Sequence, residues 1–176
     1  MERRAIGLLN RHRLMTIATL RPDGWPQATM VGYVNDGLLI YFLISRSSQK
    51  FANIDRDQRV SLTVGRDYDE PGKIEGLSIA ALASQVTDPD QRDKAYRLLV
   101  ERHPAFAAFP RPDSREAVFM RAAPRMITLI DYSRGFGHSD IITIAGADIV
   151  DMQPARPDNW GLMPAGGRPG PRLVGP

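Results

Sequence analysis

The segment MTIATLRPDGWPQATMVGYVNDGLLIYFLI, residues 15–44, has the pattern of three short β-strands joined by tight turns. The runs 15–20, 28–34 and 38–44 are largely apolar and contain β-branched or aromatic residues, which pack well on a pleated sheet. An Asp-Gly pair stands between successive runs, which is typical of hairpin turns because glycine tolerates positive φ and aspartate bonds the local backbone. The segment therefore predicts an antiparallel meander.

A short helix and more strands follow this meander. Residues 50–57 have helical spacing, with Ser47 or Ser48 available as N-cap, and the alternating run 59–66 predicts a fourth strand. We expect further strands at 74–86, 117–122 and 125–131, a short apolar segment at 141–144, and helices at the N-terminus, at 88–100 and around Phe106. Six or more mostly antiparallel strands with few helices predict a mainly β fold, a β-barrel with flanking helices, because closure removes exposed sheet edges.

The composition predicts one soluble domain without disulfides or thiolate metal sites, since 176 residues suffice for a single core and cysteine is absent. We expect this domain to span residues 1–152 and a Pro/Gly-rich C-terminal tail to span 153–176. Charges interrupt the apolar residues of the N-terminus, so we expect no signal peptide, no membrane span and a cytoplasmic location. The formal net charge is only +3 and the basic residues are spread over the whole chain, which predicts no nucleic-acid binding.

Hydroxyl, amide and cationic side chains gather directly after the third strand, in ISRSSQK at residues 44–50. These groups donate hydrogen bonds, and the helix that follows directs its first N–H groups to the same place, a combination that favours a phosphate. The simpler interpretation is a capped turn, with Ser47 or Ser48 as the cap and with Arg46 and Lys50 in solvent. The residue types alone leave both interpretations open.

The order and spacing of residues from Met15 to Val64 resemble the pyridoxamine 5'-phosphate oxidase-like family of FMN-binding split β-barrels. No single residue of the pattern is diagnostic, but together they are specific. The resemblance rests on Ala18, Thr19, Leu20, Asp23, Gly24, Pro26, Val31, Asp36, Gly37, Lys50, Asn53, Ile54, Asp57, Arg59, Val60, Ser61 and Leu62.

The resemblance implies a homodimer with FMN at the subunit interface and an oxidoreductase that acts on a small molecule. The ring would lie along the second strand, and the phosphate would be held at the exit of the third. By this correspondence the cofactor-binding residues are Gln27, Ala28, Thr29, Met30, Val31 and Gly32 for the ring, and Ser45, Arg46, Ser48, Gln49 and Lys50 for the phosphate. No catalytic residue is implied, because FMN itself performs the redox chemistry.

Two positions depart from the family pattern. Many relatives carry Arg or Lys on the second strand and an Arg-Lys pair at the phosphate, where this chain has Thr29 and Gln49. A different cofactor is therefore an alternative, in particular an 8-hydroxy-5-deazaflavin in a reductase of the same fold. A third interpretation, from another class, is a non-catalytic dimer that stores or senses a flavin or haem.

The loop DYSRGFGHSD, residues 131–140, resembles a glycine-phenylalanine loop that several relatives place near the flavin. Tyr132 and His138 are the candidate substrate contacts there, against the alternative of an exposed glycine-rich turn. Three scattered histidines and no cysteine predict no metal site.

Overall fold

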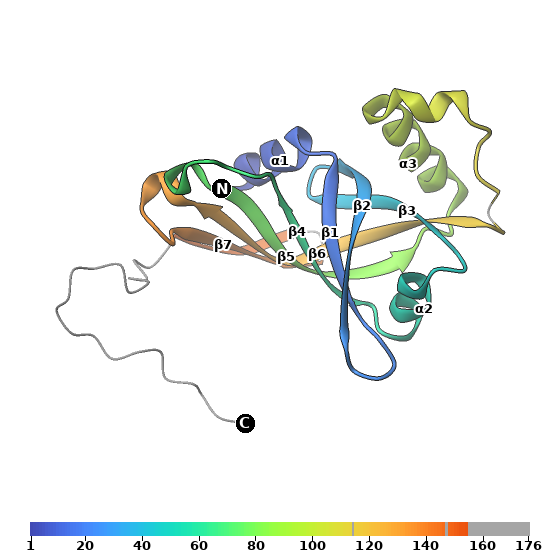
Figure 1. Ribbon diagram of the computed structural model, residues 1–176, viewed down its shortest axis with the longest axis horizontal. Helices are drawn as coiled ribbons and strands as arrows, with labels where there is room; N and C mark the ends of the chain where they lie inside the picture. The colour runs from blue at the N-terminus through green and yellow to red at the C-terminus, as the bar shows by residue number, and fades with distance from the viewer. Residues whose placement is uncertain (114, 147, 155–176) are drawn as a thin grey trace.

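The computed structural model describes residues 1–113, 115–146 and 148–154, and the account below concerns these residues. The elements follow in chain order as α1 (Glu2–Arg11), β1 (Leu14–Leu20), β2 (Pro26–Asp36), β3 (Leu39–Ser45), α2 (Gln49–Arg56), β4 (Arg59–Gly65), η1 (Pro71–Lys73), β5 (Glu75–Gln85), α3 (Pro89–Arg102), η2 (Pro104–Ala108), β6 (Ala117–Asp131), η3 (Tyr132–Arg134), β7 (Ser139–Ala145) and β8 (Asp148–Gln153). Figure 1 shows their arrangement.

The strands form a closed antiparallel barrel in the order β3-β2-β1-β4-β5-β6, with β6 paired back to β3. The first half of β6 pairs with β3, and its second half pairs with β7, which in turn pairs with β8. The barrel thus opens into an extended sheet at one end (Figure 1). The predicted β-barrel fold is confirmed.

Alternating side chains fill the inside of the barrel. In β4, Val60, Leu62 and Val64 are buried, whereas the residues between them are exposed. Burying each such aliphatic side chain contributes roughly 1.5–3 kcal/mol. The tight turns between strands also form as expected, because Gly24 and Gly37 adopt positive φ values of 84° and 59°.

Each helix covers a different part of the barrel. Ala5, Leu8 and Leu9 of α1 and Ile54 of α2 join the central core. Helix α3 instead packs on the outer face of β2, β3 and β6, in a separate apolar cluster formed by Val34, Tyr41, Val86, Ala95, Leu99 and Phe119. None of the helices in the described part of the chain is long and apolar enough to cross a membrane.

Three expectations from the sequence need correction or extension. The predicted strands at 117–122 and 125–131 are one strand, β6, because a bulge accommodates Pro124. Ala81 pairs with Pro124 and Ala80 with Met126, so Arg125 has no pairing partner on β5. Strand β8 was not predicted and includes Gln153, where the tail was expected to begin. The remainder of the predicted tail, 155–176, lies outside the described residues.

Candidate functional site

The turn between β3 and α2 brings the predicted phosphate-binding residues together. Ser48 has extended backbone angles, and its hydroxyl oxygen accepts a hydrogen bond from the Phe51 N–H at 3.3 Å while its O–H donates to the Ser45 carbonyl at 2.7 Å. Ser48 is therefore the N-cap of α2, which decides between the two serines that the sequence offered. One of its acceptor positions remains for a further donor.

The other side chains of this turn lie close to the start of α2. The hydroxyls of Ser45 and Ser47 share a hydrogen bond of 2.9 Å, and both residues are exposed. The guanidinium of Arg46 lies 5.2 Å from the centre of the Phe51 ring, a cation–π distance that orients it over the first turn of the helix. Lys50 lies half-buried in that same turn. Exposed hydroxyls, two cations and a helix N-terminus in one place suit an anionic group.

Asn53, a fully buried residue of α2, ties this turn to the first two strands. Its amide group donates to the hydroxyl of Thr19 at 2.9 Å and to the side-chain oxygen of Gln27 at 3.1 Å. Its own oxygen accepts from the Gln49 amide at 2.9 Å. Two predicted site residues from distant parts of the sequence, Gln27 and Gln49, therefore share one partner. Asn53 was part of the family-like pattern but was not predicted to have this role.

The predicted ring-binding residues of β2 divide between its two faces. Gln27, Thr29 and Val31 point into the barrel, Ala28 and Met30 point outward, with Met30 69% exposed, and Gly32 follows at the next outward position. Only Ala28 and Met30 can place side chains against a flat group outside the barrel, and Gly32 would let such a group approach the backbone. Among the described residues the hydroxyl oxygen of Thr29 is buried with no hydrogen-bond partner, although such a group usually has one.

Tyr132 and His138 lie at the other end of the barrel from α2, in the loop between β6 and β7 (Figure 1). The His138 Nε2 atom is 3.2 Å from the Oδ1 atom of Asp140, without the alignment of a hydrogen bond, and Asp140 Oδ2 accepts from Arg134 at 2.9 Å. The Tyr132 ring packs against Phe136 at 4.9 Å. Within one chain these candidate substrate contacts are therefore not brought to the Ser45 turn.

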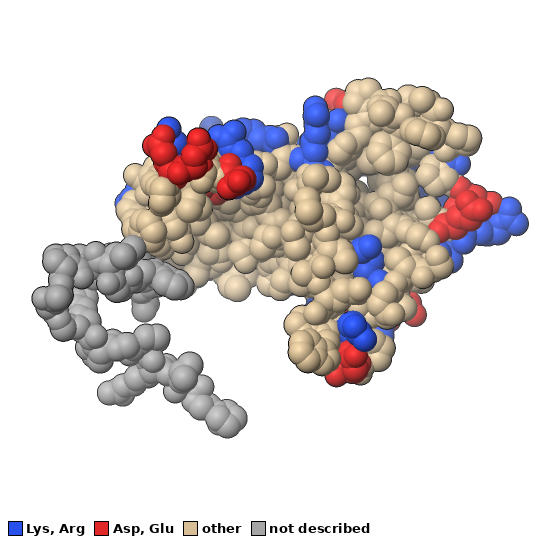
Figure 2. Space-filling model, in the orientation of Figure 1, with Lys and Arg blue, Asp and Glu red and all other residues tan. Residues whose placement is uncertain are grey.

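Two rows of uncharged side chains, all of them small except Met30, cross the outer surface of the barrel. The residues of each row are cross-strand partners, from β2 to β1, from β1 to β4 and from β4 to β5. We term this surface the uncharged outer face. Its first row is Ala28, Ala18, Ser61 and Ala80, and its second row is Met30, Thr16, Thr63 and Ser78. Figure 2 shows a broad stretch without charged groups across the middle of the molecule, where Figure 1 draws β1, β4 and β5. Such a surface can pack against another flat surface.

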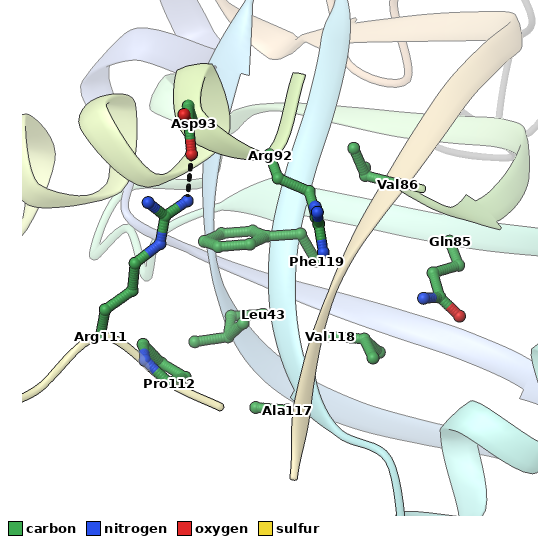
Figure 3. A pocket seen from close by; sticks show the side chains of 10 residues that line it. All are labelled: Leu43, Gln85, Val86, Arg92, Asp93, Arg111, Pro112, Ala117, Val118 and Phe119. Carbon is green, nitrogen blue, oxygen red and sulfur yellow. Dashed lines mark hydrogen bonds and ion pairs between the residues drawn. The ribbon is translucent and has the colours of Figure 1, made fainter. Parts of the chain in front are cut away.

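A cavity of about 290 Å³ adjoins the Ser45 turn (Figure 3). Its floor includes Leu43, which precedes Ser45 by two residues on the same face of β3, and Ala117, which pairs with Ser45 across the strands. Its walls come from the first turns of α3 and from Arg111 and Pro112. No group of three or more side chains suited to hold a metal ion occurs in the described parts of the chain.

Comparison with known proteins gives a family match over most of the chain. The family model described as pyridoxamine 5'-phosphate oxidase matches residues 1–131. A search of curated proteins gives no match.

Similar folds occur among solved structures. A conserved hypothetical protein from Mycobacterium tuberculosis is 25% identical with a TM-score of 0.66, over 83% of this chain and 92% of that one. A structure described as an F420 reductase is 28% identical with a TM-score of 0.56, over 69% of this chain and 93% of that one. A heme binding protein from Mycobacterium smegmatis is 21% identical with a TM-score of 0.67, and 81% of this chain matches 56% of it.

Proposed function

The chain belongs to the pyridoxamine 5'-phosphate oxidase family, and from this premise we propose that it is a flavin-dependent oxidoreductase that binds FMN and acts on a small molecule. When bound, FMN would supply hydride transfer at its ring, and the protein would supply position and electrostatics. The observation that carries the proposal is the β3–α2 turn, where Ser48 caps the helix and Arg46 and Lys50 flank its first turn.

The donors of this turn match the chemistry of a phosphate. The Ser45 and Ser47 hydroxyls are exposed, the N-terminus of α2 carries partial positive charge, and Lys50 forms no ion pair with any described residue. Hydrogen bonds between charged partners contribute about 1.5–3 kcal/mol each, so two cations can account for much of the retention of a phosphorylated cofactor. In this proposal Arg46 supplies the positive charge that an Arg or Lys on β2 supplies in many relatives, because this chain has Thr29 at that position of β2.

The proposal includes a homodimer with the cofactor between its subunits. The uncharged outer face has no charged residue among its eight side chains and includes the exposed Met30, which suits the packing of a second copy of the chain. A dimer would also let Tyr132 and His138 of one subunit approach the Ser45 turn of the other, which one chain does not achieve by itself. These two residues then remain the candidate substrate contacts.

The test is an absorption spectrum of the purified protein, followed by mass analysis of the molecule that it releases on denaturation. We expect the visible absorption of an isoalloxazine and the mass of FMN. The protein would then be reduced anaerobically with NADPH and reoxidised with added acceptors. A protein that carries no flavin and does not bind added FMN would contradict the cofactor assignment, and one whose flavin no donor reduces would be a storage or sensing dimer.

A deazaflavin reductase is the second candidate, favoured by the 28% identity to the structure described as an F420 reductase. This chain has Thr29 and Gln49 where many relatives have cationic residues, which is also compatible with a cofactor that has a different phosphate linkage. Reduced 8-hydroxy-5-deazaflavin should then bind more tightly than FMN. Parallel titration of the cofactor-free protein with both compounds separates the two candidates.

A further inference from the structure

The cavity beside the Ser45 turn has an apolar floor and a charged rim. Leu43 from β3, Phe119 from β6 and Val86 after β5 supply the floor, and the first turns of α3 overhang it (Figure 3). Its volume of about 290 Å³ lies near the lower limit for sites that hold small organic molecules. The cavity is therefore large enough for a ligand of one aromatic ring and a short chain.

Two arginines and one carboxylate give the rim an excess of positive charge. Arg111 forms an ion pair with Asp93 and also stacks on Tyr96 at 4.8 Å, so its charge has a partner. Arg92 forms no ion pair with any residue in the described ranges 1–113, 115–146 and 148–154. It is half-buried, and Figure 3 shows its side chain directed toward Phe119. The net charge at the cavity is thus close to +1.

We propose that this cavity is a second binding site, for a small organic monoanion whose acid group pairs with Arg92 and whose apolar body packs on Leu43 and Phe119. An aryl-alkyl carboxylate fits this description. A partly buried cation that forms no ion pair among the described residues favours an acid over its neutral amide, because a charge-assisted hydrogen bond is about twice as strong as a neutral one. The apolar floor also offers contacts to the body of an organic acid, which an inorganic anion cannot use because it has no apolar surface.

The cavity lies next to the proposed cofactor site, but the two sites are formed by different residues. Ala117 in the cavity floor pairs with Ser45, and the cations assigned to the phosphate, Arg46 and Lys50, belong to the turn and not to the cavity lining. An acid in the cavity would therefore lie next to the cofactor. Its binding does not depend on the flavin assignment and can be measured on protein without cofactor.

The experiment is isothermal titration calorimetry of the full-length protein with 3-phenylpropanoate and with 3-phenylpropanamide, which differ in charge but hardly in shape. We expect the acid to bind at least about tenfold more tightly than the amide. Arg92→Met keeps the apolar stem and removes the charge, so it should abolish this preference. Arg97→Met, an exposed position on the same helix that does not line the cavity, should leave it intact.

Two further measurements distinguish this site from the cofactor site. Lys50→Ala should leave the affinity for 3-phenylpropanoate unchanged, and Arg92→Met should leave cofactor retention unchanged. Circular dichroism of each variant checks that it is folded. Three results would each overturn the proposal. The native protein could bind the acid and the amide with equal affinity, it could bind neither compound, or the folded Arg92→Met variant could keep the preference for the acid.

Discussion

The buried amide of Asn53 on α2 donates a hydrogen bond of 2.9 Å to the buried hydroxyl of Thr19 on β1. Asn53 also bonds Gln27 and Gln49, so one side chain sets the position of α2 against the end of the barrel. The start of α2 is where the phosphate is proposed to bind. The precision of that site therefore depends on a residue that need not touch the ligand.

Replacing Asn53 by alanine should destabilise the protein strongly. The change leaves Thr19 with a buried hydroxyl that lacks its donor and removes partners from Gln27 and Gln49, and each unsatisfied buried group costs about 1–3 kcal/mol. We expect the free energy of unfolding, measured by urea titration, to fall by roughly 2–4 kcal/mol. Asp55→Ala, at an exposed position of the same helix, is the control and should change it by less than about 0.5 kcal/mol.

The N-cap of α2 can be tested with two neighbouring serines. Ser48→Ala removes the acceptor of the Phe51 N–H and should lower the free energy of unfolding by about 1 kcal/mol. Ser47→Ala removes only an exposed hydroxyl that pairs with Ser45, and it should have an effect within about 0.5 kcal/mol. Thermal unfolding of both variants is the measurement. Equal effects would contradict the assignment of Ser48 as the cap.

Most of this fold could be predicted from the sequence because its signals are local. The Asp-Gly turns, the alternation of β4 and a serine cap before α2 each depend on a few neighbouring residues, and the structure confirms them, with Ser48 as the cap. Helix α3 likewise begins at the start of the predicted range 88–100, where Asp88 accepts from the Gln91 N–H and Pro89 stands in the first turn. Barrel closure followed from the number of strands and the need to remove sheet edges.

What could not be predicted depends on contacts between distant residues. Pro124 reads as a break between two strands, and only its place at a bulge opposite Ala80 and Ala81 reveals one continuous β6. The role of Asn53 requires Thr19 and Gln27 to lie beside it. The division of Gln27–Gly32 between an inner and an outer face follows from period-two alternation, which the list of ring-binding residues did not apply.

The cations of the turn should control cofactor retention. Arg46→Ala and Lys50→Ala each remove a charged partner of the proposed phosphate, and each should weaken FMN binding by about tenfold or more. Fluorescence titration of cofactor-free protein with FMN gives the dissociation constants. Arg56→Ala, at the other end of α2, where it donates to the Arg21 carbonyl, is the matched control. Unchanged affinity in both turn variants would contradict the placement of the phosphate.

The pH dependence of stability should show the contribution of Asp57, which follows α2. Hydrogen bonds from the side chain and backbone of Arg59 lower the pKa of Asp57 from 3.8 to about 2. Because the folded value is the lower one, the ionised carboxylate stabilises the folded protein above pH 3.8, and this stabilisation is lost as the pH falls toward 2.

The measurement compares the native protein with Asp57→Asn by urea titration at a series of pH values. The native protein should be the more stable one by a constant margin above about pH 5, and this margin should shrink below about pH 4. A margin that is the same at every pH would show that the loss in the variant comes from packing and not from the charge.

A positive charge on the uncharged outer face should separate the proposed dimer. Ser61 lies in the centre of this face, between Ala18 on β1 and Ala80 on β5. In a two-fold interface each substitution occurs twice, so Ser61→Arg would bury two like charges and cost several kcal/mol. We expect the native protein to elute as a dimer in size-exclusion chromatography with light scattering, and Ser61→Arg to elute as a folded monomer that has lost its cofactor. Arg97→Glu, on the exposed side of α3, is the control and should remain dimeric. A native protein that elutes as a monomer would exclude this face as the interface. A Ser61→Arg variant that stays dimeric and retains its cofactor would exclude it as well.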